Sequence, residues 1–245
     1  MSTPTVVALH SLGLDSGSFD AWAHAVSPRY RWDGEDLAGH GSRAGLRNAT
    51  LATMARTVSN RISALDGVHL VGHSLGGAVA ALAAAAAPPG AVRSLILIAT
   101  PPQGFPSFAE RAEPVAATGS MAPVVEPTLH RWFDPAQLAA DTPSIRYCRD
   151  RLTTLPPNTW ITAWRSFAQF GGYAELGAAL PPTLLISGAA DQSTSPEQVG
   201  AIRPHVPRAV GHEIVADAGH MLIFDHADEL AALSCRFWQT MEEQQ

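Results

Sequence analysis

The 245-residue sequence lacks clustered positive charge and long hydrophobic runs, and each absence argues against a class of protein. The formal net charge is −6 and the 16 basic residues are scattered, which argues against a nucleic-acid-binding surface. The longest apolar run, residues 78–87, is about half as long as the roughly 20 residues of a membrane span. We therefore expect a core helix there, and neither nucleic acid nor a membrane among the partners.

Cysteine is also scarce, because Cys148 and Cys235 are the only two and match no CxxC pattern. We expect both to be free thiols, which suits a reducing compartment. The N-terminal stretch MSTPTVVALHS has no positively charged region and too short an apolar run for a signal peptide. No cluster of His, Cys and Asp has metal-ligand spacing. These features predict a cytoplasmic protein that starts near Met1 and holds no metal.

Short apolar runs rich in Val, Ile and Leu recur along the chain, each of strand length and each followed by turn residues. The runs are residues 5–9, 68–71, 94–99, 183–187 and 213–216, with a weaker one at 30–36. Alanine-rich, helix-favouring segments separate most of them. This alternation predicts an α/β fold in which about six mostly parallel strands form a sheet with helices on both faces.

Residues 101–180 interrupt the alternation of strands and helices. This segment is rich in proline and aromatic residues, contains no strand-like run, and includes two amphipathic stretches, TLHRWFDPAQLAA and NTWITAWRSFAQFGG. We interpret it as an inserted helical cap, so that residues 1–100 and 181–245 together form the core. A chain of this length is sufficient for one domain with such an insertion.

The stretch LVGHSLGG carries the pattern Gly72-x-Ser74-x-Gly76 between a strand-like run and a helix-forming run. A sharp strand-to-helix turn of this kind can hold a serine Oγ above the sheet as a nucleophile. It also places the amide of Leu75 at a helix N-terminus, where a backbone N–H can bind a developing oxyanion. Glycine–serine turns are common, and the alternative is that Ser74 is only a small residue in a tight turn.

A serine nucleophile requires a histidine base and an acid that orients the histidine. In a doubly wound sheet, functional side chains lie at the carboxyl ends of the strands. His220, in a glycine-bearing loop after the last strand, is therefore the expected base, whereas His212 and His226 are expected at the surface. Asp191, which follows the strand-like run at residues 183–187, is the expected acid. The alternative for Asp191 is that it only caps the helix that begins near Pro196.

With Ser74, Asp191 and His220 in this order, the sequence resembles the α/β-hydrolase superfamily over nearly its whole length. Three further stretches match the landmarks of that family, namely LHSLGLDSGSFDAW, DLAGHGSR and DAGHMLIFDHADELAALSCRFW. The resemblance implies an α/β-hydrolase fold and a serine hydrolase that needs no cofactor. The three residues would act as nucleophile, orienting acid and general base in turn.

The resemblance also implies that the backbone amides of Leu12 and Leu75 form the oxyanion hole. Ser11 departs from the glycine that is usual in the family at that turn, which affects the width of the pocket. His10 ends the first strand and could line the pocket. Because this strand begins so close to Met1, we expect the N-terminal β-hairpin of the family to be absent.

The implied reaction is cleavage of an ester, lactone or activated carbonyl bond of a small apolar or aromatic substrate through an acyl-enzyme. The stretch of residues 11–22 resembles the 3-oxoadipate enol-lactonases and related small carbon–carbon and ester hydrolases. Three alternatives use the same fold: a cofactor-free haloperoxidase or perhydrolase, a biosynthetic lyase or cyclase, and a receptor that binds a ligand without turnover. The sequence indicates no particular oligomeric state.

Aromatic residues of the cap are the expected contacts of the substrate. Trp160, Trp164 and Phe167 share one helical face, and with Trp132 and Phe133 they could form an apolar roof over the serine. The alternative is that this face only attaches the cap to the core. The same choice between pocket and solvent applies to the arginines of the cap, which are Arg131, Arg146, Arg149, Arg151 and Arg165.

Overall fold

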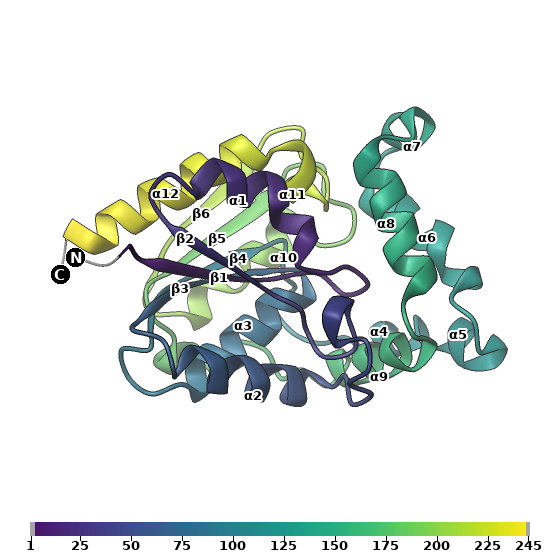
Figure 1. Ribbon diagram of the computed structural model, residues 1–245, viewed down its shortest axis with the longest axis horizontal. Coiled ribbons are helices and arrows are strands. Elements are labelled where there is room, and N and C mark those ends of the chain that lie inside the picture. The colour runs from purple at the N-terminus through teal and green to yellow at the C-terminus, as the bar shows by residue number, and fades with distance from the viewer. Residues whose placement is uncertain (1–2, 244–245) are drawn as a thin grey trace.

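A sheet of six strands forms the centre of the computed structural model, which describes residues 3–243 (Figure 1). The strands are β1 (Thr5–Leu9), β2 (Arg31–Glu35), β3 (Val68–His73), β4 (Val92–Ile98), β5 (Thr183–Gly188) and β6 (Ala209–Val215). They lie in the order β2-β1-β3-β4-β5-β6, and every neighbouring pair is parallel. The predicted six-stranded parallel sheet without an N-terminal hairpin is confirmed.

The largest difference from the predicted strand boundaries is at β6, which begins at Ala209 and not at residue 213. β6 is the edge strand, and most of its residues are half-buried or exposed. Its first half is held by backbone pairing with β5, in which Gly211 lies opposite Leu184. Because one side of an edge strand is solvated, its sequence does not carry the continuous apolar run that marks the buried strands.

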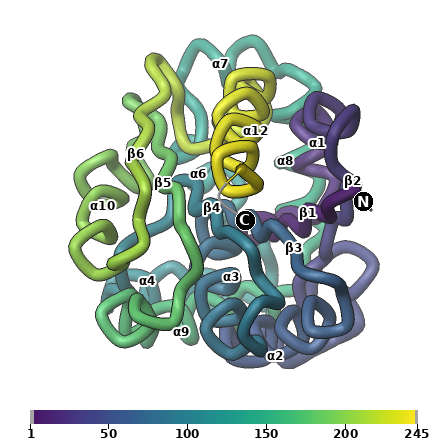
Figure 2. The backbone as a smooth tube through the Cα atoms, turned by 90° about the vertical axis from the view of Figure 1, so that its left-hand side faces the viewer, coloured from purple at the N-terminus to yellow at the C-terminus, as the bar shows by residue number. Residues whose placement is uncertain are grey.

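Helices cover both faces of the sheet (Figure 2). One face carries α1 (Asp20–Val26), α11 (Leu222–Asp225) and α12 (Ala227–Glu243), and the other carries α2 (Leu51–Ile62) and α3 (Leu75–Ala86). The short helix α10 (Pro196–Gly200) follows β5, and four 3₁₀ turns complete the core at Ser16–Phe19, Gly41–Arg43, Gly177–Ala179 and Arg203–His205. Among the helices of residues 3–243, none combines the length and the apolar character needed to cross a membrane.

The buried strands alternate between two hydrophobic clusters. In β1, Val7 and Leu9 pack into the cluster on the side of α2 and α3, while Val6 and Ala8 pack into the cluster on the side of α1 and α12. In β4, Leu95 and Leu97 follow the first pattern, and Ile96 and Ile98 follow the second. Both sides of these strands are apolar because the strand period of two directs successive side chains to opposite faces.

Six short helices lie between β4 and β5, where the sequence predicts a helical insertion. They are α4 (Pro106–Glu110), α5 (Glu113–Thr118), α6 (Ala122–Trp132), α7 (Pro135–Ala140), α8 (Pro143–Thr154) and α9 (Pro157–Phe167). Figure 1 shows them gathered beyond one end of the sheet. Four of them start on a proline, which has no N–H to leave unpaired at the first helical position.

Polar contacts and apolar packing both attach the inserted helices to the rest of the chain. The hydroxyl of Tyr147 on α8 donates to Asp15 Oδ1 over 2.5 Å, and Arg151 Nη1 lies 3.1 Å from Asp15 Oδ2. On α9, Ser166 Oγ accepts the N–H of Leu51 at 3.0 Å. Buried side chains of α4 and α9 belong to the same cluster as those between the sheet and α3. The boundaries of a core and a cap domain stay a prediction.

Candidate active site

Ser74 lies at the turn between β3 and α3, with φ 55° and ψ −119°, a backbone conformation that non-glycine residues rarely adopt. Its N–H donates to the carbonyl of Ile98 over 2.8 Å, and Thr100 Oγ1 donates to its carbonyl. The flanking glycines are required by space, because a Cβ on Gly72 would overlap the backbone of Gly76. The strained turn therefore requires the glycines of the GxSxG pattern.

The structure brings the three predicted residues Ser74, Asp191 and His220 together at the carboxyl ends of β3, β5 and β6. His220 Nδ1 lies 2.8 Å from Asp191 Oδ2, and His220 Nε2 lies 3.2 Å from Ser74 Oγ. His220 is 2% exposed and Asp191 5% exposed. An ionised carboxylate can only accept, so Nδ1 carries the proton and Nε2 is free to accept the serine proton.

Asp191 is held in place by its second carboxylate oxygen. Oδ1 accepts the N–H groups of Ser193 at 2.7 Å and Thr194 at 2.9 Å. Burial raises the pKa of this carboxyl, but attraction to His220 and these hydrogen bonds outweigh burial and hold its pKa below the usual value. The alternative role as a helix cap is not seen, because Ser195 is the N-cap of α10. Asp191 is thus ionised and oriented toward the histidine.

His73, the residue before the nucleophile, supports the loop that carries His220. Its Nε2–H donates to the carbonyl of His220 over 2.9 Å, and the two rings lie 5.2 Å apart between centroids. Burial, together with the neighbouring His220, lowers the pKa of His73 to about 3. A neutral, buried imidazole therefore holds the backbone of His220, the candidate general base, in place.

Leu12 and Leu75, the expected oxyanion donors, line the same cavity as Ser74 and His220. Within residues 3–243, neither backbone N–H donates a hydrogen bond to a protein group. Leu75 is the first residue of α3, where the backbone N–H has no partner inside the helix. Two free amides beside a serine Oγ are what an oxyanion hole requires.

His10 lies beneath the turn of Leu12 and outside the residues that line the cavity. Its Nδ1–H donates to the carbonyl of Ser11 over 2.8 Å, and its Nε2 accepts the N–H of Leu37 at 3.0 Å. Both ring nitrogens are therefore used by the backbone, and burial lowers the pKa of the ring. The structure places His10 as a support of the turn and does not bring it to the substrate side.

His40 supports the same turn from the segment DLAGHGSR. Its Nε2 accepts the N–H of Gly13 at 3.1 Å, and its Nδ1–H donates to the carbonyl of Ala38 over 3.1 Å. The rings of His10 and His40 meet edge to face with 4.9 Å between centroids. Burial and the neighbouring His10 lower the pKa of His40 to about 3. Two neutral histidines thus fix the turn that carries the amide of Leu12.

These buried neutral histidines predict a loss of stability in mild acid. The pKa of His40 and of His73 is about 3 in the folded chain, below the roughly 6.5 of an unfolded chain. Their stabilising contribution is therefore complete above about pH 6.5. As the pH falls below that value, the unfolded chain binds protons that the folded chain excludes. Each histidine then costs about 1.4 kcal/mol of unfolding free energy per pH unit.

Urea unfolding at pH 7.5 and 5.5 tests this prediction, and His40→Gln is the matched variant. Glutamine can accept from Gly13 and donate to Ala38 without titrating, so the variant is expected to lose less stability between the two pH values. Carboxylates with lowered pKa, such as Asp191, act in the same direction but only at lower pH. Equal unfolding free energies of the wild type at both pH values contradict the prediction.

The cavity at Ser74 is narrow, and four of its lining residues are Phe or Trp. Its volume is about 20 Å³, room for about one water molecule. Of the predicted aromatic contacts, Trp132, Trp164 and Phe167 line it, whereas Trp160 does not. Trp132 lies nearly parallel to the ring of His220, with 6.5 Å between centroids. Phe133 lines the neighbouring cavity instead. The aromatic roof is therefore supplied by Trp132, Trp164 and Phe167 together with Phe108 of α4, and a substrate must displace side chains to enter.

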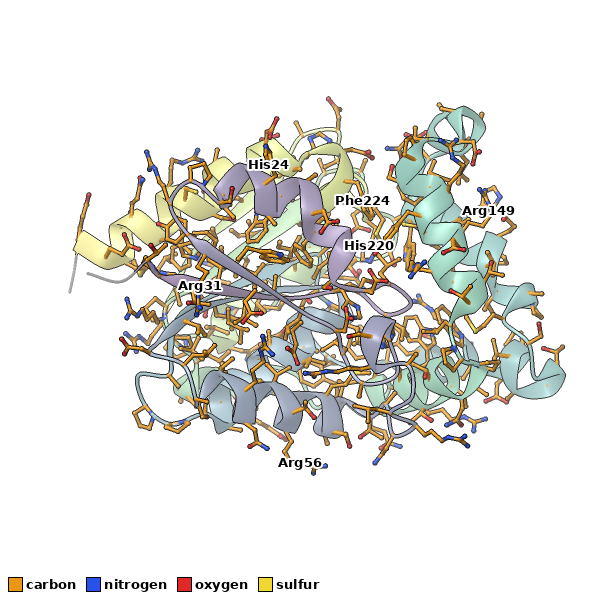
Figure 3. The ribbon with its side chains drawn as sticks, in the orientation of Figure 1. His24, Arg31, Arg56, Arg149, His220 and Phe224 are labelled. Carbon is orange, nitrogen blue, oxygen red and sulfur yellow. The ribbon has the colours of Figure 1, made fainter. Side chains whose placement is uncertain are left out.

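Trp160 and most of the cap arginines serve other contacts. Trp160 is buried, and its Nε1–H donates to the carbonyl of Arg111 over 2.8 Å. Arg149 pairs with Glu126 and Asp141 on the inserted helices, on the side of α8 away from His220 (Figure 3). Arg146, Arg151 and Arg165 also pair with carboxylates. For these four arginines, the structure places the guanidinium outside the cavity.

Several cavity residues were not identified from the sequence, and Phe108 and Arg111 are the two of them on the inserted helices. They lie three positions apart at the end of α4, a spacing that puts them on one side of a helix. The stretch PSFAERA follows the carboxyl end of β4 closely, and this is the signal that could have located them. As for metals, the described part of the chain contains no group of three or more His, Cys, Asp and Glu able to hold an ion.

The sequence is similar to known proteins that include a lactonase and a methyl ester esterase. The chain is 24% identical to 3-oxoadipate enol-lactonase 1 of Acinetobacter baylyi over 98% of this chain and 91% of that protein. It is 29% identical to the pimeloyl-[acyl-carrier protein] methyl ester esterase of Nitrosomonas europaea over 84% of both chains.

Among solved structures, the enol-lactonase of Burkholderia xenovorans superimposes with a TM-score of 0.86 at 22% identity, covering 98% of this chain and 92% of that one. This likeness shows the α/β-hydrolase fold, with the inserted helices α4–α9 in it. The model of the alpha/beta hydrolase family matches residues 6–233, and the chain therefore belongs to the alpha/beta hydrolase family.

Proposed function

We propose that the protein is a serine hydrolase that cleaves a carboxylic ester or lactone bond (EC 3.1) of a small substrate with apolar or aromatic character. The observation that carries this proposal is the hydrogen-bonded series Ser74, His220 and Asp191 beside two free backbone amides. The similarity to an enol-lactonase and to a methyl ester esterase supports the same reaction class.

Acylation begins when Ser74 Oγ attacks the carbonyl carbon of the bound ester. His220 Nε2 removes the serine proton as the new C–O bond forms, and Asp191 stabilises the imidazolium through Nδ1–H. The carbonyl oxygen becomes an oxyanion, which accepts hydrogen bonds from the amides of Leu12 and Leu75. When the tetrahedral intermediate collapses, the imidazolium returns the proton to the departing alkoxide and an alcohol leaves.

Deacylation repeats these steps with water in place of the serine. His220 Nε2 removes a proton from water, the hydroxide attacks the acyl carbon, and the proton returns to Ser74 Oγ as the carboxylic acid is released. Every proton is carried by the imidazole, so the cycle needs no further reactant. The aromatic rings of Trp132, Trp164 and Phe167 would contact the apolar part of the substrate.

Covalent labelling tests the nucleophile directly. A fluorophosphonate probe should modify the protein once, and peptide mass spectrometry should find the probe on Ser74. Ser74→Ala should lose the label, whereas Ser63→Ala, at an exposed serine beyond α2, should keep it. A probe found on another residue, or no probe at all on a folded protein, would overturn the assignment.

Steady-state kinetics then separate hydrolysis from the other activities of this fold. A hydrolase should release many equivalents of p-nitrophenol per chain from a p-nitrophenyl ester in the absence of peroxide. A ligand receptor should release at most one equivalent, and a perhydrolase should require peroxide for its main activity. A single turnover by folded protein that has not been treated with the probe contradicts the proposed hydrolase.

A further inference from the structure

Arg111 places a cation in the wall of the cavity at Ser74. It is the C-cap residue of α4, and its carbonyl is fixed by the Nε1–H of Trp160 at 2.8 Å. Its guanidinium carbon lies 4.6 Å from the ring centroid of Trp164 and 5.1 Å from that of Phe108. Two aromatic rings of the cavity therefore hold the guanidinium in a fixed position.

The guanidinium of Arg111 has no partner among the described residues. No carboxylate lies within ion-pair distance of it, and none of its N–H groups donates a hydrogen bond to residues 3–243. By contrast, other arginines of the inserted helices form ion pairs with carboxylates, and Arg149, for example, pairs with Glu126. Burial lowers the pKa of Arg111, with no carboxylate to offset the effect. A half-buried cation without an anion has lost part of its hydration, and an anionic ligand in the cavity would compensate for that loss.

A second donor without an acceptor belongs to Trp164, a residue that lines the same cavity. The Nε1–H of Trp164 is buried and, within residues 3–243, has no hydrogen-bond partner. The polar side chains that line the cavity are those of Arg111 and His220 and the hydroxyl groups of Ser11, Ser74, Ser193 and Thr194. No carboxylate side chain is among the lining residues. N–H groups that have no acceptor in the protein, beside a cavity without carboxylates, are suited to bind a ligand group that only accepts hydrogen bonds.

A second arginine lies beside the first cavity. Arg131 lines the neighbouring cavity, which shares Trp132 and His220 with the first and is also lined by Asp134 and Asp217. Burial and repulsion from Arg111 lower the pKa of Arg131 to about 10, so both arginines are charged at neutral pH. Arg131 donates to Thr128 and to the carbonyl of Pro127, and no acid of the described chain pairs with it. The acidic residues of the neighbouring cavity do not line the cavity at Ser74, where Arg111 is the one arginine among the lining residues.

We propose that Arg111 binds a carboxylate of the substrate, so that the substrate is an ester or lactone that carries a free carboxylate away from the reacting carbonyl. This inference rests on the proposed function of Ser74. The planar guanidinium presents paired N–H groups that match the two oxygens of a carboxylate. A flat carboxylate also suits a narrow cavity bounded by the rings of Phe108 and Trp164. Arg111 is thus the residue that determines specificity for an acidic substrate.

The test compares matched anionic and neutral esters. In the first arm, p-nitrophenyl half-esters of dicarboxylic acids with four to eight carbons are compared with p-nitrophenyl esters of the methyl-terminated acids of equal length. In the second arm, 4-carboxyphenyl hexanoate is compared with 4-carbamoylphenyl hexanoate, which places the carboxylate on the leaving group. The wild type should show about 10- to 100-fold higher kcat/KM for the anionic member of at least one arm.

The variants assign this preference to one residue. Arg111→Met should reduce the anionic-to-neutral ratio of kcat/KM about 10- to 100-fold, mainly through KM, and Arg111→Lys should keep part of it. Arg165→Met, at an exposed arginine of α9 paired with Glu113, is the matched control and should keep the wild-type ratio. Circular dichroism and thermal unfolding show whether each variant is folded.

The outcomes separate this inference from the proposed function. A wild type that hydrolyses esters through Ser74 but prefers neutral esters in both arms overturns the carboxylate site and leaves the hydrolase intact. The same holds if Arg111→Met changes the ratio no more than Arg165→Met does. If Arg111→Met does not fold, the wild-type preference and its reduction in Arg111→Lys decide the question. A wild type whose activity equals that of Ser74→Ala overturns the proposed function itself.

Discussion

Replacing Ser74 by alanine is expected to reduce kcat for p-nitrophenyl ester hydrolysis by about 10⁴-fold or more. The variant keeps the cavity and the free amides of Leu12 and Leu75, so ground-state binding should change little. It removes the atom that lies 3.2 Å from His220 Nε2 and that would form the covalent intermediate. Catalysis that survives would come only from the amides and from water activated by the histidine.

The fold should tolerate this substitution. Alanine has the same Cβ as serine at φ 55°, and the turn is held by backbone hydrogen bonds that the hydroxyl does not make. Stopped assays of p-nitrophenol release measure the loss. Ser63→Ala is purified in parallel as the control for a contaminating esterase. A Ser74→Ala enzyme with more than one tenth of the wild-type kcat contradicts the role of Ser74 as nucleophile.

The sequence predicted the sheet and the meeting of Ser74, Asp191 and His220 for the same physical reason. Buried parallel strands need apolar residues on both faces, so their positions can be read from runs of Val, Ile and Leu. Parallel strands also bring their carboxyl ends to one edge, so a residue that follows a strand is placed without knowledge of side-chain packing. The edge strand β6 was located only in part, because its solvated residues break the apolar run.

The contents of the cavity depend on packing that the sequence does not reveal. Trp160 and Trp164 share a helical face, yet only Trp164 lines the cavity, because Trp160 points its Nε1–H to the carbonyl of Arg111. His10 ends β1 as predicted, but both of its ring nitrogens bind backbone groups. Arg111 reaches the cavity only because α4 and α9 cross there. The positions of these side chains depend on how the short helices pack, and the periodicity of the sequence does not encode that packing.

Asp191→Asn is expected to reduce kcat about 10⁴-fold while leaving the fold intact, an effect known from serine proteases that carry the same substitution. In the wild type, Oδ2 accepts from His220 Nδ1–H at 2.8 Å, and Oδ1 accepts from Ser193 and Thr194. An asparagine whose amide oxygen keeps the two backbone hydrogen bonds must turn its NH₂ group toward the histidine. The imidazole then has to accept at Nδ1 and carry its proton on Nε2.

In that tautomer Nε2 carries a proton and donates toward Ser74, so it cannot accept the serine proton. Acylation should therefore fail although every residue stays in place. The loss should appear in kcat with little change in KM, because the aromatic cavity that binds the substrate is untouched. Asp191→Ala is the matched comparison: it also removes the acceptor for Ser193 and Thr194, so it should additionally lower the melting temperature. If Asp191→Asn retains wild-type kcat, another group orients His220, and the carboxylate serves only the loop that leads to α10.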